Sequence, residues 1–306
     1  MDLVSAIITT HNRYDLLKKA IDSVLCQTYP NIECIVVDDA SDKDNTLDIR
    51  EKYGERVKFI RIEKKDSKGG NHARNVGIQN SKGKYVAFLD DDDIWSKEKI
   101  EKQIEYLNNN PQCEFVYCGR TCDYIEYEEE CLPDELNQGD CSNRILYNII
   151  CVTSTIMCTK RILELVGGFD ENLKFWQEYD LTIRIFQHTK VGYVNEPLIR
   201  YLVDQNDKNR LTNKYYEWWN SVKYQNNKYK DLINSLTEDE KKKRKQMIYH
   251  DAVLRSGNIG DKKEIRKNLW MLCRLDFSVK NLKKFIFFIT PEWVKKIRNL
   301  LKGNRK

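Results

Sequence analysis

Several features that define common protein classes are absent from this sequence. Its ten cysteines include no Cys-x-x-Cys pair, and Cys118 and Cys122 come nearest to one. Only four histidines are present, so a zinc site built from cysteine and histidine is not expected. We therefore expect the cysteines to be small core residues in a reducing setting.

Signals for export and membrane insertion are also missing. The first residues, Met1-Asp-Leu-Val-Ser, lack the basic region of a signal peptide. No apolar run approaches the roughly 20 residues that a transmembrane helix needs. Together with the cysteine usage, this leads us to expect a cytoplasmic protein.

Charge is unevenly distributed along the chain. Residues 280–306 contain nine Lys or Arg and one acid, Glu292, for a net charge of +8. The whole chain carries +5, so residues 1–279 carry −3. This distribution argues against a nucleic-acid-binding surface and indicates a basic appendage on a mildly acidic body.

Strand and helix patterns alternate through the first 110 residues. Apolar runs predict buried strands at 3–9, 32–37, 57–62 and 85–89, with helices at 15–27, 46–53, after Gly70 and at 97–110. This order predicts an α/β fold with a mostly parallel sheet covered by helices on both faces. No Gly-x-Gly-x-x-Gly follows the first strand, which disfavours a dinucleotide-binding dehydrogenase. Residues 193–201 predict an edge strand, because Pro197 cannot donate a ladder hydrogen bond.

Four consecutive carboxylates, Asp90 to Asp93, follow the strand at 85–89. They repel one another, so a metal, cationic partners or water must stabilise them. In an extended chain Asp90 and Asp92 lie on the same side and could bind one divalent cation. The alternative is an acidic helix start with Ser96 as the cap of a helix from Lys97, which explains only one or two of the acids.

Polar clusters end three of the predicted strands: Thr10–Arg13, Asp38-Asp39 and Asp90–Asp93. In parallel sheets, ligands bind outside the carboxyl ends of the strands. The sequence therefore predicts a metal and phosphate site at this rim.

Six segments in order resemble the family 2 inverting glycosyltransferases, which adopt the GT-A type nucleotide-sugar-binding fold. They are Val4–Arg13, Val36–Ser41, Ala73–Gly77, Phe88–Trp95, Gly167–Glu171 and Glu178–Leu181. The resemblance covers about residues 3–200. It is closest to bacterial capsular and cell-surface polysaccharide enzymes.

The resemblance implies a set of roles for individual residues. The nucleotide would be held by Thr9, Thr10, His11, Asn12, Arg13, Asp38 and Asp39, with Asp39 accepting a hydrogen bond from the base, usually uracil. Asp90-Asp91-Asp92 matches the family's Asp-x-Asp motif. Asp90 would face ribose or metal, Asp91 the sugar, and Asp92 would be the main ligand of Mn²⁺ or Mg²⁺, while Asp93 would lead into the next helix. Arg74 would neutralise nearby acids or the diphosphate, with a helical salt bridge as an equal alternative.

The catalytic base implied by the resemblance is Glu178, with Asp180 as the second candidate; a solvated acid at a helix start is the alternative for either. The chain departs from the family at two places. Gln177-Glu178 stands where the family usually has Glu-Asp, and 201–212 lacks the histidine that many members have there. Asp204, Asn206 or Arg210 could replace that histidine.

The activity implied by the resemblance is transfer of a sugar from a nucleotide-sugar donor, usually a UDP-sugar, to a glycan or lipid-linked saccharide acceptor. Two alternatives remain. A nucleotidyltransferase would usually carry a Gly-rich, basic first loop, which Thr9–Arg13 is not. A catalytically silent nucleotide-sugar-binding partner is compatible with Gln177 and the missing histidine.

We expect a catalytic domain at 1–210, a helical extension at 211–279 and a basic amphipathic tail at 280–306. The tail interleaves aromatic and aliphatic residues with lysines, as a helix lying on a membrane surface does. The prediction is peripheral contact with the inner face of the plasma membrane; docking to a partner or packing on the core is the alternative.

Overall fold

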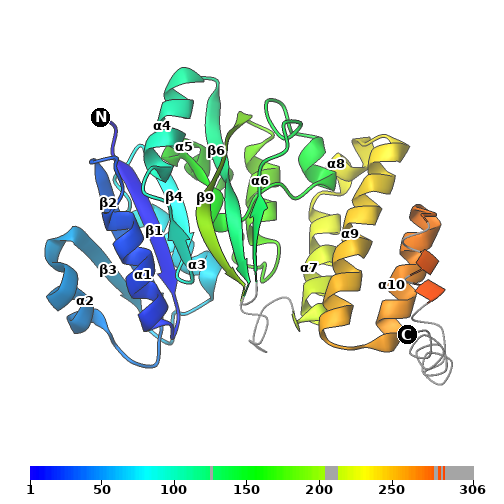
Figure 1. The fold of residues 1–306 in the computed structure, drawn as a ribbon, viewed down its shortest axis with the longest axis horizontal. Helices are drawn as coiled ribbons and strands as arrows, with labels where there is room; N and C mark the ends of the chain where they lie inside the picture. The colour runs from blue at the N-terminus through cyan, green and yellow to red at the C-terminus, as the bar shows by residue number, and fades with distance from the viewer. Residues whose placement is uncertain (125–126, 204–212, 279–281, 284, 287–306) are drawn as a thin grey trace, which may run out of the picture. The chain divides into compact units, whose positions relative to one another are not determined.

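The computed structural model describes residues 1–124, 127–203, 213–278, 282–283 and 285–286. The chain divides into two compact units, Met1–Asn206 and Asp207–Lys306. Unit 1 combines a large sheet with flanking helices, and unit 2 is helical where it is described (Figure 1). The α/β fold with a helical C-terminal region is thereby confirmed, whereas the division of the chain by role stays a prediction.

The first half of the sheet in unit 1 is parallel. Strands β1 (Val4–Thr10), β2 (Ile32–Asp39), β3 (Val57–Ile62) and β4 (Tyr85–Asp90) lie in the order β3-β2-β1-β4. Helices α1 (Tyr14–Leu25), α2 (Thr46–Tyr53) and α3 (Gly70–Asn80) connect them. The central strands β1 and β4 are buried along almost their whole length, because helices cover both faces of this part of the sheet.

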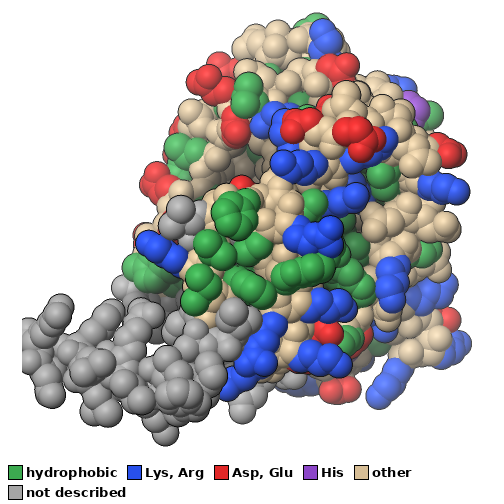
Figure 2. All heavy atoms as spheres, turned by 90° about the vertical axis from the view of Figure 1, so that its right-hand side faces the viewer, with side chains coloured by type: hydrophobic (Ala, Val, Ile, Leu, Met, Phe, Trp, Pro, Cys, Tyr) green, Lys and Arg blue, Asp and Glu red, His purple; other side chains and the backbone are tan. Residues whose placement is uncertain are grey.

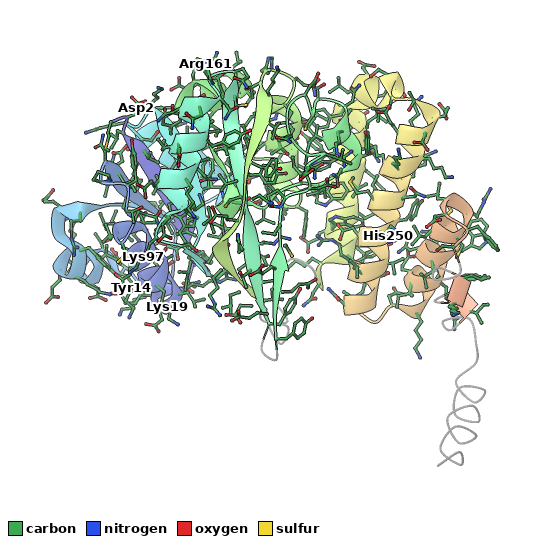
Figure 3. All side chains as sticks on the ribbon, turned by 45° about the horizontal axis from the view of Figure 1, so that its top comes forward. Asp2, Tyr14, Lys19, Lys97, Arg161 and His250 are labelled. Atoms are coloured by element: carbon green, nitrogen blue, oxygen red, sulfur yellow. The ribbon has the colours of Figure 1, made fainter. Side chains whose placement is uncertain are left out.

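Beyond β4 the sheet is mixed, not mostly parallel. Strand β8 (Met157–Thr159) runs antiparallel to β4 and to β6 (Cys113–Tyr124), and β6 is parallel to β9 (Lys190–Val203). Strands β5 (Asp93–Trp95) and β7 (Glu128–Cys131) pair antiparallel with β9 and β6. The reversal is visible in Figure 3. Arg161, which follows β8, lies near Asp2, which precedes β1, and Tyr14, which follows β1, lies at the opposite end of the strands.

The prediction that the strand around Pro197 lies at a sheet edge was wrong. Strand β9 lies between β6 and β5. Pro197 is tolerated because it sits between two register shifts of the β6–β9 pair, and because β5 pairs only with 199–201. Pro197 is itself opposite Gly119, and β5 reaches β9 only from Ile199 onward, so the missing N–H of proline removes no bond to β5.

The helices of unit 1 bury their apolar stripes on the sheet, and side chains fill the layers between them (Figure 3). On α1 the buried stripe includes Leu17, Ile21 and Val24, at the spacing expected from the sequence. Helix α4 (Lys99–Asn109) begins after Glu98 without a side-chain cap, so the expected Ser96 cap was wrong. The remaining helices are α5 (Lys160–Val166), α6 (Gln177–Ile185) and the 3₁₀ turns η1 (Gly54–Arg56), η2 (Arg144–Tyr147) and η3 (Thr153–Thr155).

Unit 2 contains α7 (Tyr215–Lys228), α8 (Lys230–Ser235), α9 (Glu238–Asn258) and α10 (Lys262–Leu275) among its described residues. Helix α9 packs on α7 and α10 around the fully buried Trp218 and Leu269. A capping box between Thr237 and Glu240 begins α9. No helix in the described parts of the chain is long and apolar enough to cross a membrane. All ten cysteines are free and eight are buried, as expected of small core residues.

Candidate active site

The three polar clusters lie together at the carboxyl rim of the parallel half of the sheet. Strand β1 lies between β2 and β4, with Thr10 opposite Asp38 and Thr9 opposite Asp90. Residues that are far apart in sequence are therefore neighbours in space because parallel strands end at the same edge.

The β1–α1 segment is bonded directly to the acidic run. Thr10 Oγ1 donates to Asp91 Oδ2 at 2.6 Å, and Arg13 lies 3.3 Å from Asp91 and 2.7 Å from Asp92. Asp91 is only 5% exposed. Burial raises the pKa of Asp91 to about 6, and the hydrogen bond from Thr10 opposes that rise. Asp91 is thus a buried anchor between β1 and β4, whereas the family resemblance assigned it to the sugar.

Asp90 and Asp92 remain as the pair that could bind a cation. Burial raises the pKa of Asp92, and the neighbouring charge of Asp90 raises it further. No group of three or more His, Cys, Asp or Glu among the described residues is placed to hold a metal. A hard cation can take one or two protein carboxylates and complete its shell with water and substrate phosphates. The role of Asp90 and Asp92 as its ligands stays a prediction.

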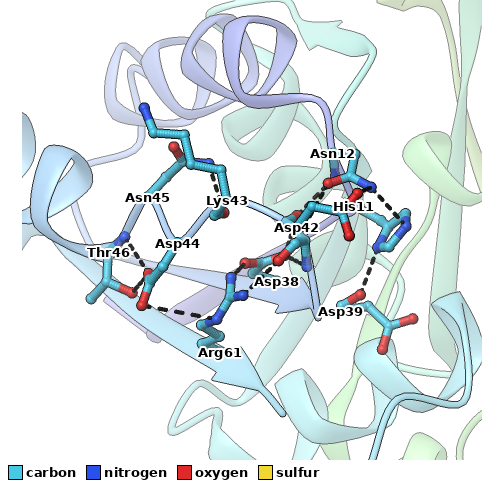
Figure 4. Close-up of polar contacts among 11 residues, drawn as sticks. His11, Asn12, Asp38, Asp39, Asp42, Lys43, Asp44, Asn45, Thr46 and Arg61 are labelled. Carbon is cyan, nitrogen blue, oxygen red and sulfur yellow. Dashed lines mark hydrogen bonds and ion pairs between the residues drawn. The ribbon is translucent and has the colours of Figure 1, made fainter. Parts of the chain in front are cut away.

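The loops after β1 and β2 hold each other in place (Figure 4). Asn12, whose φ is +59°, exchanges side-chain hydrogen bonds with Asp42 at 2.8 and 3.1 Å. Asp38 is enclosed: Ser41 donates to Oδ1 at 2.5 Å and Arg61 to Oδ2 at 2.5 Å. These contacts shape the loop, and a direct role of Asp38 in binding a nucleotide stays a prediction.

Asp39 presents a buried oxygen to which none of the described residues donates a hydrogen bond. Its backbone carbonyl lies 2.7 Å from His11 Nδ1, which fixes the position of the residue (Figure 4). Its side chain is 7% exposed, and Oδ1 is buried without a hydrogen-bond partner. A buried acceptor without a donor is unfavourable, so this oxygen is suited to receive an N–H from a ligand.

Arg74 links the acidic run to helix α6. This buried guanidinium donates to Asp90 at 2.7 Å and to Gln177 Oε1 at 2.8 Å, and it stacks on the ring of Phe169 at 5.3 Å. Since Gln177 is the first residue of α6, the contact places the start of α6 beside the end of β4. A salt bridge within α3 was the alternative role for Arg74; its observed partners lie on other elements.

The two candidate bases on α6 have different surroundings. Glu178 is half-buried in the first turn of the helix. Asp180 is fully buried, and Arg184 donates to it at 2.7 and 3.0 Å. The same guanidinium binds the carbonyl oxygens of Val166 and Gly168. Asp180 is therefore bound in a structural network, and Glu178 is the better placed of the two to meet a substrate.

Asp93 does not lead into a helix, as the sequence suggested. It begins β5, is 1% exposed, and accepts a hydrogen bond from Ser154 Oγ at 2.5 Å. Burial raises the pKa of Asp93 well above its ordinary value. Ser154 also accepts from the backbone N–H of Asp90 at 3.0 Å, so it supports the acidic run from below. Sequence reasoning missed Ser154, because an isolated serine in a long connection carries no pattern.

The structure brings Thr9 to Arg13, Asp38, Asp39, Arg74 and Asp90 to Asp92 to one rim, with Gln177 joined to them through Arg74. The candidates for the missing histidine, Asp204, Asn206 and Arg210, lie outside the described residues.

Comparison with known proteins gives a consistent assignment. The model described as Glycosyl transferase family 2 matches residues 5–157. An uncharacterised glycosyltransferase of Rickettsia prowazekii is 36% identical over 65% of this chain and 63% of its own length. WfaP of Escherichia coli, a UDP-Glc:alpha-D-GlcNAc-diphosphoundecaprenol beta-1,3-glucosyltransferase, is 38% identical over 45% of this chain and 55% of its own. The aligned parts thus span less than two thirds of each relative.

Among solved structures, S. aureus TarS residues 1–349 in complex with UDP has the same fold. The TM-score is 0.57 at 17% identity, covering 94% of this chain and 88% of that one.

Proposed function

The chain belongs to glycosyltransferase family 2, and from that premise we propose that it transfers a sugar from a nucleotide-sugar donor to a saccharide acceptor with inversion at the anomeric carbon. The observation that carries the proposal is the joined rim itself. Thr10 and Arg13 bind Asp91 and Asp92, while Arg74 joins Asp90 to the start of α6. These contacts connect the segment after β1, which would bind the donor, to the start of α6, which would carry the base.

The unsatisfied oxygen of Asp39 supports binding of a nucleotide base. Uracil carries one ring N–H that can donate a hydrogen bond to a carboxylate, and the buried Oδ1 has no donor in the described part of the chain. The names of two similar proteins, WfaP with UDP-Glc and TarS with UDP, agree with a UDP-sugar. We therefore propose a UDP-sugar as the donor.

Asp90 and Asp92 would hold Mn²⁺ or Mg²⁺, which when bound stabilises charge on the departing diphosphate. Arg13 already neutralises part of the charge of Asp92, and Arg74 does so for Asp90.

Glu178 is the proposed general base. As the acceptor oxygen bonds to the anomeric carbon, its proton passes to the Glu178 carboxylate, and the bond from that carbon to the phosphate oxygen breaks. Nucleoside diphosphate leaves with the bonding electrons. Direct displacement of this kind inverts the anomeric centre.

The names of two relatives support a proposal for the acceptor and the cellular setting. WfaP acts on a lipid-diphosphate-linked sugar, and a similar Bacillus subtilis protein is named as a putative teichuronic acid glycosyltransferase. We propose that this chain also acts in cell-surface polysaccharide synthesis, on a saccharide that can be lipid-linked.

Peripheral contact with a membrane surface is part of the proposal. The predicted tail, 280–306, lies almost entirely outside the described residues. Helix α10, however, has an exposed stripe, which we call the α10 outer face: Lys263, Arg266, Lys267, Trp270 and Arg274, continued by Phe277. Trp270 is 46% and Phe277 80% exposed, and hydrophobic side chains gather beside Lys and Arg on this side of the protein (Figure 2). Aromatic residues flanked by cations suit an anionic lipid surface.

A thermal-shift panel of nucleotide sugars, with and without Mn²⁺, tests the donor proposal. The melting temperature should rise with UDP-sugars more than with GDP- or CMP-sugars, and more with Mn²⁺ than without. A protein that responds to no nucleotide sugar would contradict the proposal.

A further inference from the structure

Arg120 is a cation at the rim of the sheet that the family resemblance did not assign. Strand pairing connects Ala87 of β4 to Met157 of β8, and Met157 to Val116 of β6. Ala87 and Val116 are therefore at the same height in the sheet. Because β4 and β6 run in the same direction, Asp90 and Gly119, each three residues further along, are also at similar heights. Arg120 follows Gly119 and is therefore at the height of the acidic run, two strand positions away, or about 10 Å.

The strand pairing around Arg120 is irregular. Register shifts of the β6–β9 pair lie on both sides of Gly119. A side chain at Gly119 would meet the carbonyl oxygen of Glu196 at 2.8 Å, so only glycine allows β9 to approach there. Bulges of this type occur next to active sites, where they re-aim a neighbouring residue.

Among the described residues, Arg120 has no carboxylate partner. Its guanidinium lies 5.7 Å from the ring centre of Tyr201, and its Nε is buried without a hydrogen-bond partner. The other half-buried or buried arginines of unit 1 in the described residues are paired: Arg61 with Asp38, Arg74 with Asp90, Arg144 with Asp134 and Arg184 with Asp180.

The thiols around Arg120 do not replace a carboxylate. Cys131 faces it across the β6–β7 pair, and the sulfurs of Cys122 and Cys131 lie 3.7 Å apart. Burial raises the pKa of Cys131, so its thiol stays neutral near pH 7. Within the described part of the chain, this partly buried guanidinium has a ring and thiols beside it and no anion, and an anionic ligand would balance its charge.

Arg120 is also close to the candidate base. Burial raises the pKa of the Cys151 thiol well above its ordinary value, and the charges of Glu178 and Arg120 both act on it, in opposite directions. Cys151 thus lies within electrostatic range of both residues. An anion bound by Arg120 would therefore lie in the part of unit 1 that also contains Glu178.

We propose that Arg120 binds a phosphate group of the acceptor and so positions the acceptor hydroxyl beside Glu178. The inference rests on the proposed transferase function for the identity of the acceptor, but the anion site itself does not. It makes Arg120 a residue that selects phosphate-bearing acceptors, such as a sugar attached to a lipid through phosphate. Guanidinium is suited to this because it donates two parallel hydrogen bonds to phosphate oxygens.

The test measures binding of inorganic phosphate to the full chain. The readout is the melting temperature at constant ionic strength, with UDP and Mg²⁺ at saturation. The wild type should show a saturable rise in melting temperature, Arg120→Lys a weaker one, and Arg120→Gln an affinity at least tenfold lower. Arg200→Gln is the matched control, because Arg200 lies on the neighbouring strand and is paired with Asp123 and Glu128. It should bind phosphate like the wild type.

Three outcomes would overturn the proposal. The first is a wild type without saturable phosphate binding, and the second is undiminished binding in Arg120→Gln. The third is a phosphate effect that disappears when UDP is bound, because the anion site would then be that of the donor diphosphate. If UDP itself causes no shift while Arg120-dependent phosphate binding persists, the donor proposal fails and the anion site stands.

Discussion

Glu178 and Asp180 lie two residues apart at the start of α6, and their surroundings suit them to different tasks. Asp180 is enclosed by Arg184, which also binds two carbonyl oxygens of the preceding turn. Glu178 is half-buried on the turn that Arg74 and Gln177 connect to Asp90. Asp180 therefore stabilises the fold, and Glu178 stays our proposed base.

Substitution separates these two tasks. Glu178→Gln should reduce sugar transfer by roughly 10²- to 10⁴-fold, because the base is lost, with an unchanged unfolding midpoint. Asp180→Asn should lower the free energy of unfolding by about 3 kcal/mol, because it leaves the Arg184 cation without its buried partner. Urea denaturation and an assay of released UDP measure the two effects. The reverse pattern would exchange the roles.

Lys99 gives a pH-dependent prediction away from the active site. It is fully buried, lies 4.1 Å from the Trp95 ring centre and donates to Gln103 at 2.8 Å. Burial lowers the pKa of Lys99 to about 8. In the unfolded chain the pKa of Lys99 is near 10.5, so between about pH 8 and 10.5 the unfolded chain binds more protons than the folded one. The free energy of unfolding therefore rises with pH in that window.

Comparison with Lys99→Met isolates that contribution. Between pH 7.5 and 9.5 the free energy of unfolding of the wild type should rise by roughly 2 kcal/mol relative to the variant. Urea titrations of both proteins at the two pH values measure it, and other titrating groups cancel in the difference. A constant difference would show that Lys99 does not titrate in this range.

At single positions, sequence reasoning succeeded where a residue type has one dominant use. Asp39 and Arg74 were singled out from motif positions, and both are buried at the rim with contacts across elements. Asp93 and Ser154 were not foreseen, because their hydrogen bond joins residues 61 positions apart. Nothing local in either segment indicates that pairing.

Among the elements, the turn at Gly167–Glu171 has the clearest link to the site. It follows α5 and packs on α3: Asn75 accepts from Phe169 N–H at 2.8 Å and donates to its carbonyl at 2.9 Å. The ring of Phe169 in turn lies under Arg74. The turn therefore fixes the guanidinium that connects β4 to α6.

Gly168→Ala tests the importance of this turn. Gly168 has a φ of +68°, and an added Cβ would lie 2.5 Å from Asn75 Oδ1. The free energy of unfolding should fall by about 2–3 kcal/mol, and sugar transfer should fall with it because Arg74 loses its support. Gly167→Ala is the control, since φ is +77° there with open space around it, and only about 1 kcal/mol is expected. Equal losses in the two variants would contradict the packing argument.

Element prediction was accurate for the regular parts of the chain. Strands β1 and β4 are largely apolar runs, helix α1 has strong periodicity, and β1 to β4 and α1 to α3 all appear close to the expected bounds. The interior position of β9 could not be foreseen, because local sequence does not indicate which strand β5 will join. The antiparallel insertion of β8 is likewise a property of long-range pairing.

At the scale of the whole molecule, unit 2 offers a surface with no evident part in donor chemistry. The α10 outer face combines two exposed aromatic residues with four cations, and Arg274 stacks on Trp270 at 4.8 Å. Basic residues near an anionic lipid surface contribute about 1 kcal/mol each. The proposed membrane contact therefore has described residues to support it, in addition to the tail.

Vesicle co-sedimentation tests this surface. The full chain should bind vesicles containing phosphatidylglycerol more than neutral phosphatidylcholine vesicles, and Trp270→Ser with Phe277→Ser should reduce binding at least fivefold. Leu47→Ser is the matched control, because Leu47 is 77% exposed on unit 1. Unchanged binding in the double variant, or equal binding to neutral vesicles, would contradict the proposal.

The central claim is that the rim of unit 1 activates a nucleotide sugar through Asp92 and a divalent cation. The most direct measurement is the rate of UDP release from a UDP-sugar with Mn²⁺, compared between wild type and Asp92→Ala. The account predicts Mn²⁺-dependent release by the wild type and a loss of at least 100-fold in the variant. Wild-type rates in Asp92→Ala with excess Mn²⁺ would contradict it.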